Sequence, residues 1–511
     1  MIMETIKLVP GELTLAQLRK IAAGNVQIDI DDACRERVAI AAGTVEEVLK
    51  RGKSVYGINT GFGLMAKTRI DEDSLRDLQR NLVLSHCTGT GDALPDAVVR
   101  LILALKVTSL AAGHSGVRPL VIDALIALFN NGIYPLIPAK GSVGASGDLA
   151  PLAHMSLALI GEGDVRHEGQ IISAMAGLAK AGIEGVTLAP KEGLALLNGT
   201  QVSTALTLSG LFAIEDNFAA AVLAGSVSVD AAKGSDTPFD DRIHKLRRQP
   251  GQIAVAAKYR ELLADSEIRR SHVDCERVQD PYSLRCQPQV MGACLDQIHH
   301  AAVILEREAN AVTDNPLIFP DQGDILSGGN FHAEPVAFAA DILAIAASEI
   351  GAISERRIAL LIDPAMVDLP AFLVENGGLN SGFMIAQVTA AALASENKTL
   401  AHPASIDSLP TSANQEDHVS MATFAGRRLG DIADNVNGIL AIEMLAACQA
   451  IEFRRPMTSS DALEKVIASV REVAAFYDRD RYFAPDIAAV KALLKSSAIH
   501  GYVDDLLPSF A

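Results

Sequence analysis

Ala145, Ser146 and Gly147 are consecutive residues whose types suit an unusual backbone reaction. If the amide nitrogen of Gly147 attacks the carbonyl carbon of Ala145, the backbone closes into a five-membered ring. Ser146 can then lose its hydroxyl and leave an exocyclic methylidene. Glycine has no Cβ, so the backbone can bend as sharply as this ring requires. The product, 4-methylideneimidazol-5-one, is an electrophile, a kind of group that ordinary side chains do not supply.

Two simpler interpretations of this segment stay open when the triplet is taken alone. Glycine-rich turns followed by Asp or Ser are common helix starts, and the sequence predicts a helix from Asp148 to Ile160. The glycines at 141, 144 and 147 also suggest a phosphate cradle. However, no Lys-Ser or Lys-Thr pair follows Gly147, and no clear dinucleotide fingerprint surrounds it.

Seven motifs along the chain, in order and spacing, resemble those of the histidine and aromatic amino acid ammonia-lyases. One such motif would be a weak signal, whereas seven in order are specific, and the resemblance extends from about Tyr56 to the segment 478–485. The motifs are Tyr56–Gly63, Gly141–Leu152, Asn198–Gln201, Gln279–Gln289, Asp314–Pro316, Ser327–His332 and Ser412–His418.

The resemblance implies that the ring forms autocatalytically from Ala145-Ser146-Gly147 and that no metal or diffusible cofactor is needed. It also implies a homotetramer of dihedral symmetry with active sites shared between subunits. The expected reaction converts L-histidine to trans-urocanate and ammonia, the first step of histidine degradation. Action on tyrosine or phenylalanine, as a lyase or aminomutase, is the alternative, and a helical scaffold without activity is a further one.

Three residues around the ring receive roles from this resemblance. Tyr56, in a glycine-flanked loop, is the expected base for the β-proton, although a tyrosine needs its phenolate stabilised to act so. Asn198 is expected to support the ring, and Phe331 to pack near it. Taken alone, Tyr56 could be a buried loop tyrosine, Asn198 a helix N-cap and Phe331 a core residue.

Arg285 is the residue we expect to bind the substrate carboxylate, because a guanidinium can donate two parallel hydrogen bonds to it. A structural ion pair is the commoner fate of an arginine. Tyr282 lies on the same face if this stretch is helical, which Pro281 makes uncertain. The resemblance implies that Gln279, Tyr282 and Arg285 reach the site from a neighbouring subunit.

His86 and Glu416 are the expected determinants of specificity. Ser85-His86 replaces the Phe-Leu of phenylalanine-type lyases and the His-Leu of tyrosine-type lyases, and Glu416 replaces a glutamine of the aromatic lyases. An imidazole carries polar nitrogens that an apolar pocket would leave unpaired, at a cost in free energy. His86 and Glu416 can pair with these nitrogens. Cys87 stands where a small residue such as alanine is expected.

Composition predicts a large, acidic protein. The chain has 511 residues, a net charge of −18 and no tryptophan, which argues against a nucleic-acid or anionic-membrane surface. No signal peptide or convincing membrane span is visible, since Arg100 and Lys106 interrupt the apolar stretch 98–113. Six scattered cysteines suggest reduced thiols in the cytoplasm. His332 and Glu334 are interpreted as structural, so no metal site is expected.

The predicted fold is mainly α: a long-helix bundle core with a smaller mixed N-terminal domain. Residues 1–110 form the predicted N-terminal domain, with the Tyr56 loop and His86, a short strand pair near residues 26–30 and a helix over 32–52. Residues 111–511 form an elongated helical domain that carries the electrophile and the tetramer core. Helical spacing is clear in the run 429–453.

Two further helices carry specific expectations. One spans residues 342–356, where Glu349 and Arg356 suggest a polar contact that interrupts an apolar stripe. The other includes residues 386–394 and is apolar nearly all round, which is typical of a buried helix. In a protein with this much helix, it suggests that subunits pack through their central helices.

Overall fold

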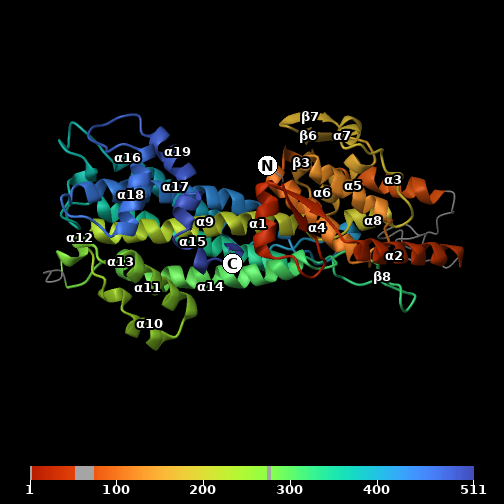
Figure 1. The fold of residues 1–511 in the computed structure, drawn as a ribbon, viewed down its shortest axis with the longest axis horizontal. Helices are drawn as coiled ribbons and strands as arrows, with labels where there is room; N and C mark the ends of the chain where they lie inside the picture. Colours follow the sequence, from red (N-terminus) through yellow and green to blue (C-terminus); the bar gives the residue numbers. More distant parts are fainter. Residues whose placement is uncertain (1–2, 52–73, 273–277, 511) are drawn as a thin grey trace. The chain divides into compact units, whose positions relative to one another are not determined.

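Helices form most of the chain, as the sequence predicts, and the strands are short (Figure 1). The structure, a computed structural model, describes residues 3–51, 74–272 and 278–510, so Tyr56 and its loop lie outside the described residues. Packing divides the chain into two compact units. Unit 1 comprises Met1–Ser209, Ala302–Asp341 and Pro403–Arg427, and unit 2 comprises Gly210–Ala301, Ile342–His402 and Arg428–Ala511.

These units are discontinuous along the sequence, and unit 1 includes residues on both sides of the predicted boundary at residue 110. The division into an N-terminal domain and an elongated helical domain stays a prediction. Four long helices contribute residues to both units; they are α9 (Gln201–Ala231), α14 (Gln287–Ala309), α15 (Glu334–Leu361) and α17 (Ala422–Glu452).

Unit 1 mixes helices with short strands. Its helices are α1 (Leu15–Ala23), α2 (Asp32–Lys50), α3 (Leu75–His86), α4 (Asp96–Ala111), α5 (Pro119–Asn130), α6 (Leu149–Leu159), α7 (Ala174–Lys180) and α8 (Glu192–Leu197). Its strands are β1 (Glu4–Lys7), β2 (Val26–Asp29), β3 (Thr90–Ala93), β4 (Ile133–Pro135), β5 (Pro138–Lys140), β6 (Asp164–His167), β7 (Gln170–Ser173), β8 (Leu317–Phe319) and β9 (Asp324–Leu326).

The strands of unit 1 form small sheets rather than one layer. β1 pairs with β2 in parallel, with Glu4 opposite Val26, which confirms the predicted strand pair. β4, β6 and β7 form an antiparallel sheet, β3 pairs with β5, and β8 pairs with β9. The core lies among the helices instead: α4 is buried at every residue from Val98 to Ala111 except for the partial exposure of Arg100.

The regular elements of unit 2 among its described residues are helices, joined by loops. Apart from its parts of the four long helices, it contains α10 (Asp241–Arg247), α11 (Pro250–Leu262), α12 (Glu267–Arg270), α13 (Tyr282–Arg285), α16 (Met384–Leu400), α18 (Asp461–Val473), α19 (Ala484–Leu493) and α20 (Ser497–His500).

A buried ion pair crosses the core of unit 2. Arg357 Nη2 donates to Glu443 Oε2 at 2.8 Å, and both side chains are fully buried. Ser228 and Ser354 donate to the same carboxylate at 2.8 and 2.6 Å. Of the two residues whose types suggested a polar contact on α15, Arg356 donates to the carboxylate of the neighbouring Glu355.

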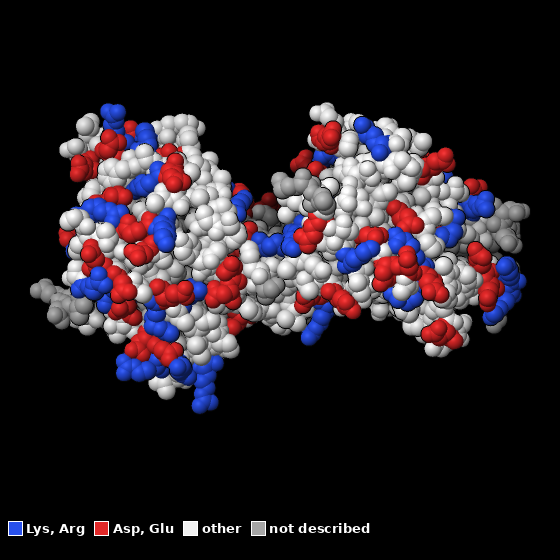
Figure 2. Space-filling view, viewed as in Figure 1, with Lys and Arg blue, Asp and Glu red and all other residues white. Residues whose placement is uncertain are grey.

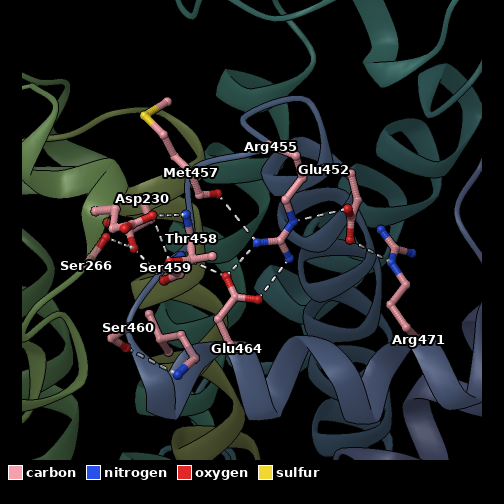
Figure 3. A network of polar contacts seen from close by, with 12 residues as sticks. Asp230, Ser266, Glu452, Arg455, Met457, Thr458, Ser459, Ser460, Glu464 and Arg471 are labelled. Carbon is pink, nitrogen blue, oxygen red and sulfur yellow. Dashed lines mark hydrogen bonds and ion pairs between the residues drawn. The ribbon is translucent and has the colours of Figure 1, made fainter.

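A second polar network of unit 2 surrounds the end of α9 and the start of α18 (Figure 3). Asp230 is buried. Ser266 Oγ donates to its Oδ2 at 2.8 Å, and Ser459 Oγ donates a shorter hydrogen bond to the same oxygen. Nearby, Arg455 donates to both carboxylate oxygens of Glu464 at 2.8 Å. Burial raises the pKa of Asp230 to about 6, despite the opposing effect of the two serine hydrogen bonds.

Two helices, α9 and α15, are long and apolar enough to cross a membrane, but most of their apolar windows are buried, as in core helices of a folded protein. Within the single chain α16 is buried on one side only, and its expected burial between packed subunits stays a prediction. Ala386 and Ala390 are buried, whereas Ile385 and Val388 are 64% and 53% exposed, so one apolar face of this helix is open in the single chain. On the face in Figure 2, acidic and basic side chains are interspersed.

Candidate active site

The segment 145–147 forms a tight bend in unit 1. The backbone pairs Ala145 with Gly147, and Gly147 with Gly199. Gly147 has φ +71°, and a Cβ added there would lie 2.3 Å from the Gly199 carbonyl oxygen. A side chain at this position would therefore be both strained and blocked. Ser146 is only half-buried, so its side chain is accessible.

Asn198 holds the bend from the end of α8. Its Nδ2 donates to the Ser146 carbonyl oxygen at 2.8 Å, as its expected support of the ring requires. Its Oδ1 is buried and has no hydrogen-bond partner among the described residues. The alternative of an N-cap is wrong, because Asn198 is the C-cap of α8 and its side chain is directed to Ser146.

Asp148 ties this loop to two distant helices. Its carboxylate accepts hydrogen bonds from Thr423 Oγ1 at 2.6 Å, from the Ser203 amide at 2.7 Å and from Ser142 Oγ at 3.1 Å. Complete burial raises the pKa of Asp148, against the effect of these hydrogen bonds. The sequence indicated Asp148 only as a helix start, yet its side chain makes no capping bond to α6.

Glu416 contacts Ser146 directly. Ser146 Oγ donates to Glu416 Oε1 at 2.7 Å, while Thr411 and Ser412 hydroxyls donate to Oε2 at 2.6 and 2.9 Å. Partial burial would raise the pKa of Glu416, but these three hydrogen bonds and the nearby His86 together hold it below its ordinary value. Glu416 is therefore an ionised acceptor at neutral pH. Sequence analysis missed Thr411 and Ser412, although Ser412 opens one of the seven motifs.

His86 ends α3, where its ring is half-buried. Its Nδ1 lies 2.8 Å from the Leu82 carbonyl oxygen, which can only accept, so Nδ1 carries the proton and Nε2 is the acceptor of the neutral ring. Burial lowers the pKa of His86, and the charge of Glu416 opposes this. The charge of Glu416 therefore acts on His86, so the two predicted specificity residues lie near each other. Next to them, burial raises the pKa of the Cys87 thiol to about 11.

Phe331 is half-buried in the loop between β9 and α15. The ring of the adjacent His332 stacks on that of His418 with centroids 5.9 Å apart, so this loop lies beside the one that carries Glu416. The role of Phe331 stays a prediction. His332 Nδ1 lies 3.9 Å from Glu334 Oε2, and no cluster of three metal-ligand residues occurs in the described part of the chain.

Gln279, Tyr282 and Arg285 lie together in unit 2. Arg285 Nη2 donates to Gln279 Oε1 at 3.0 Å, and the guanidinium lies over the Tyr282 ring, 4.7 Å from its centroid. Pro281 precedes the short helix α13 as its N-cap, so Tyr282 and Arg285 do share a helical turn. Tyr282 is 70% exposed. The group is thus assembled and accessible.

The family described as aromatic amino acid lyase matches residues 13–472. A curated histidine ammonia-lyase of Aliivibrio fischeri is 62% identical over 509 residues, 99% of this chain and 100% of the relative. Among solved structures, a histidine ammonia-lyase from Trypanosoma cruzi has 42% identity and a TM-score of 0.91, covering 99% of this chain and 96% of its own.

A tyrosine aminomutase from Streptomyces globisporus is also similar, with 35% identity and a TM-score of 0.93 over 98% of both chains. These matches extend over nearly the whole chain, beyond the seven motifs. The chain therefore belongs to the aromatic amino acid lyase family and is an ammonia-lyase.

Proposed function

We propose that this chain deaminates L-histidine without oxidation, giving trans-urocanate and ammonia as the first step of histidine degradation. The observation that carries the proposal is the position of Glu416, which accepts a hydrogen bond from Ser146 and is coupled to His86. Curated relatives 60–64% identical to this chain are histidine ammonia-lyases, which favours histidine over tyrosine or phenylalanine.

The bend at 145–147 fits 4-methylideneimidazol-5-one, because Gly147 can only be glycine there and Asn198 Oδ1 is a buried polar atom left open beside it. When formed, this group supplies an electrophilic methylidene that takes up the substrate amine. Asn198 Nδ2 is placed to stabilise negative charge on the Ser146 oxygen, since a preorganised donor needs no rearrangement during the reaction. The Asp148 carboxylate holds the loop around residues 145–147 through hydrogen bonds from Ser142, Ser203 and Thr423.

Glu416 and His86 recognise the imidazole in this proposal. A carboxylate with a lowered pKa can accept an imidazole N–H, and the neutral His86 adds a second acceptor at Nε2. Together the two acceptors match the two N–H donors of an imidazolium, the protonated form of the substrate ring. A phenyl ring would leave both groups desolvated and unpaired. Sites built around polar partners reject analogues that lack them by ~10⁴-fold in favourable cases.

Tyr56 is the proposed base for the β-proton, and Phe331 packs near the ring. Arg285 is proposed to bind the substrate carboxylate: its Nε and Nη2 bond Asp280 and Gln279, and Nη1 together with the second Nη2 hydrogen serves the carboxylate. Tyr282, next to Arg285, is proposed to complete the catalytic set from a neighbouring subunit. Its exposure supports this arrangement.

The proposed assembly is a homotetramer in the cytoplasm. The open apolar face of α16 supports oligomerisation, because helices with such faces are stabilised by covering them. The cysteines that the structure describes are unpaired thiols, and this supports a reducing compartment.

The test is ultraviolet absorbance of purified protein on adding histidine, with phenylalanine and tyrosine in parallel. Urocanate is conjugated, so absorbance should rise with histidine and far less with the other two. Mass analysis of the peptide spanning 145–147 should show the loss of two water molecules. Ser146→Ala should lose activity by several orders of magnitude and keep the unmodified mass.

Equal rates with phenylalanine would instead support the aromatic alternative, and product rearranged without ammonia release would indicate an aminomutase. An unmodified peptide in active protein would refute the ring. No turnover of any of these amino acids by protein with a complete ring would refute the proposed reaction.

A further inference from the structure

Lys106 is a buried cation in the middle of α4. Its side chain is 1% exposed, in a helix whose neighbouring residues are buried apolar side chains such as Leu105 and Val107. Burying an ammonium costs free energy unless hydrogen bonds compensate for the lost water. A methionine would fill the same space without that cost, so the contacts of the ammonium need an explanation.

Both hydrogen-bond acceptors of Lys106 Nζ are main-chain carbonyls at the end of α8. The ammonium donates to Asn198 O at 2.8 Å and to Ala195 O at 3.2 Å. The last carbonyls of a helix have no partner within the helix, and a cation is favourable there. Since Asn198 Nδ2 donates to Ser146 O, one residue joins Lys106 to the electrophile loop.

The two residues that follow Asn198, Gly199 and Thr200, are also held by hydrogen bonds. The Asp148 amide donates to Gly199 O at 2.8 Å, and the Thr200 amide donates to Thr313 Oγ1 at 3.2 Å. Lys106 supplies the corresponding bond at Asn198 itself. Without it, the peptide that orients the Asn198 side chain would lose its one charged partner.

Three other buried charged groups lie near Lys106: Asp148, Lys191 and Asp314. Lys191 is equally buried, but it bonds Asp314 Oδ2 at 3.1 Å and the Ser115 carbonyl, away from Asn198. Burial lowers the pKa of Lys106 to about 7, with the two aspartates opposing and Lys191 reinforcing this shift. Both lysines are therefore buried, but Lys106 bonds the end of α8 at Asn198, whereas Lys191 bonds Asp314 and Ser115.

We propose that Lys106 is a positioning residue for the lyase reaction: its bond to the Asn198 carbonyl holds the Asn198 amide in line with the Ser146 carbonyl. The inference rests on the proposed function only in assigning Ser146 to the ring. It adds to that function a residue on another helix, which acts through Asn198 and touches neither substrate nor ring.

The experiment compares Lys106→Met with the matched control Lys191→Met. Thermal unfolding, the mass of the peptide spanning 145–147, the near-ultraviolet absorbance of the ring, and kcat and KM for histidine are measured on the full-length protein. Lys106→Met should lower kcat roughly 10-fold or more with KM little changed, since one misaligned electrostatic donor commonly costs this much. Its ring absorbance should shift, or its ring should be incomplete.

Lys191→Met should lose a similar amount of thermal stability yet keep the parent absorbance and kcat within about threefold, because it leaves Asn198 in place. In an Asn198→Ala background, Lys106→Met should have little further effect on kcat, because residues that act through one another are not additive.

Equal effects of the two lysine substitutions, or parent values of both kcat and absorbance in Lys106→Met, would overturn the proposal. If Lys106→Met does not fold, Lys106→Gln and Lys191→Gln replace the pair. Failure of both Lys106 variants to fold, with the Lys191 variants folded, would show a purely structural role. Absorbance and mass need no substrate, so they decide the role of Lys106 even if the parent does not deaminate histidine.

Discussion

Ser146 is bonded at its carbonyl oxygen and at its hydroxyl, and the two bonds would act differently in the proposed reaction. Its carbonyl accepts from Asn198, which can stabilise charge on that oxygen, while its hydroxyl donates to Glu416. Loss of that hydroxyl in the proposed ring would free Glu416 Oε1 for the substrate. Thr411 and Ser412 would continue to hold Oε2, so Glu416 would remain oriented.

Glu416→Gln should lower kcat/KM for histidine by roughly 10²-fold or more, because the amide keeps the shape but loses the charge that favours an imidazole N–H. Phenylalanine turnover should fall much less. Adding His86→Phe should move the ratio of the two kcat/KM values further towards phenylalanine. The measurement is kcat/KM for both amino acids in the parent, the two single variants and the double variant.

A parent that handles both amino acids equally, or variants that leave their ratio unchanged, would withdraw His86 and Glu416 as specificity residues. Ring content by mass serves as the control, because Glu416 contacts the Ser146 hydroxyl and a variant with an incomplete ring would lose turnover of both substrates in proportion.

At the scale of elements, the site is built from helix ends. His86 is the last residue of α3, Asn198 follows α8, and Asp148 precedes α6. Helix ends leave backbone groups unpaired, and side chains there can reach across to other segments. These helices give their ends a fixed base, and the proposed site residues His86, Asn198 and Asp148 lie where the helices stop or start.

Helix α9 ends in unit 2 with a buried carboxyl whose ionisation affects stability. The folded pKa of Asp230, about 6, lies above its ordinary value of 3.8, so the folded protein binds this proton more tightly than the unfolded chain does. Its favourable contribution is present below about pH 4 and is lost as the pH rises through 6. This difference of about two between the folded and ordinary pKa values corresponds to about 3 kcal/mol in the free energy of unfolding.

Asp230→Asn should therefore gain stability relative to the parent as the pH rises from 4 to 7.5. The measurement is the midpoint of thermal unfolding at half-unit intervals of pH, with exposed Asp321→Asn as the control for a general change of charge. A difference between variant and parent that does not change with pH would show that the Asp230 network in Figure 3 does not titrate in this range.

For the whole molecule, the proposed tetramer would cover the open face of α16 and bring the exposed Tyr282 to a neighbouring subunit. Ile385→Glu should yield particles smaller than the tetramer, because a carboxylate would be buried without a partner at the interface. Histidine turnover should fall with assembly, since Arg285 is proposed to act on a neighbouring subunit's site.

Light scattering after size-exclusion chromatography, together with activity, tests this expectation. Ile171→Glu is the matched control, because Ile171 is also 64% exposed but lies on the β7 strand. A tetramer that survives Ile385→Glu with full activity would contradict the role of α16 in assembly, and a parent that is monomeric and active would contradict the shared site.

Much of the helical architecture follows from local sequence. The predicted helices 32–52 and 148–160 correspond to α2 and α6 within two residues at each end, because apolar spacing and end residues act over one or two turns. The grouping of Gln279, Tyr282 and Arg285 was predictable for the same reason, since all three lie within seven residues.

The family and its reaction class were likewise determined by the sequence, through the types and order of residues in seven motifs. Tertiary structure alone decided which distant residues meet: Asp148 with Thr423, Glu416 with Ser146, and Lys106 with Asn198. It also set the buried ion pair of Arg357 with Glu443, and it left one apolar face of α16 exposed in the single chain. Periodicity shows which side of a helix is apolar, but the partner of a buried polar group depends on how remote segments pack, and no local pattern records that.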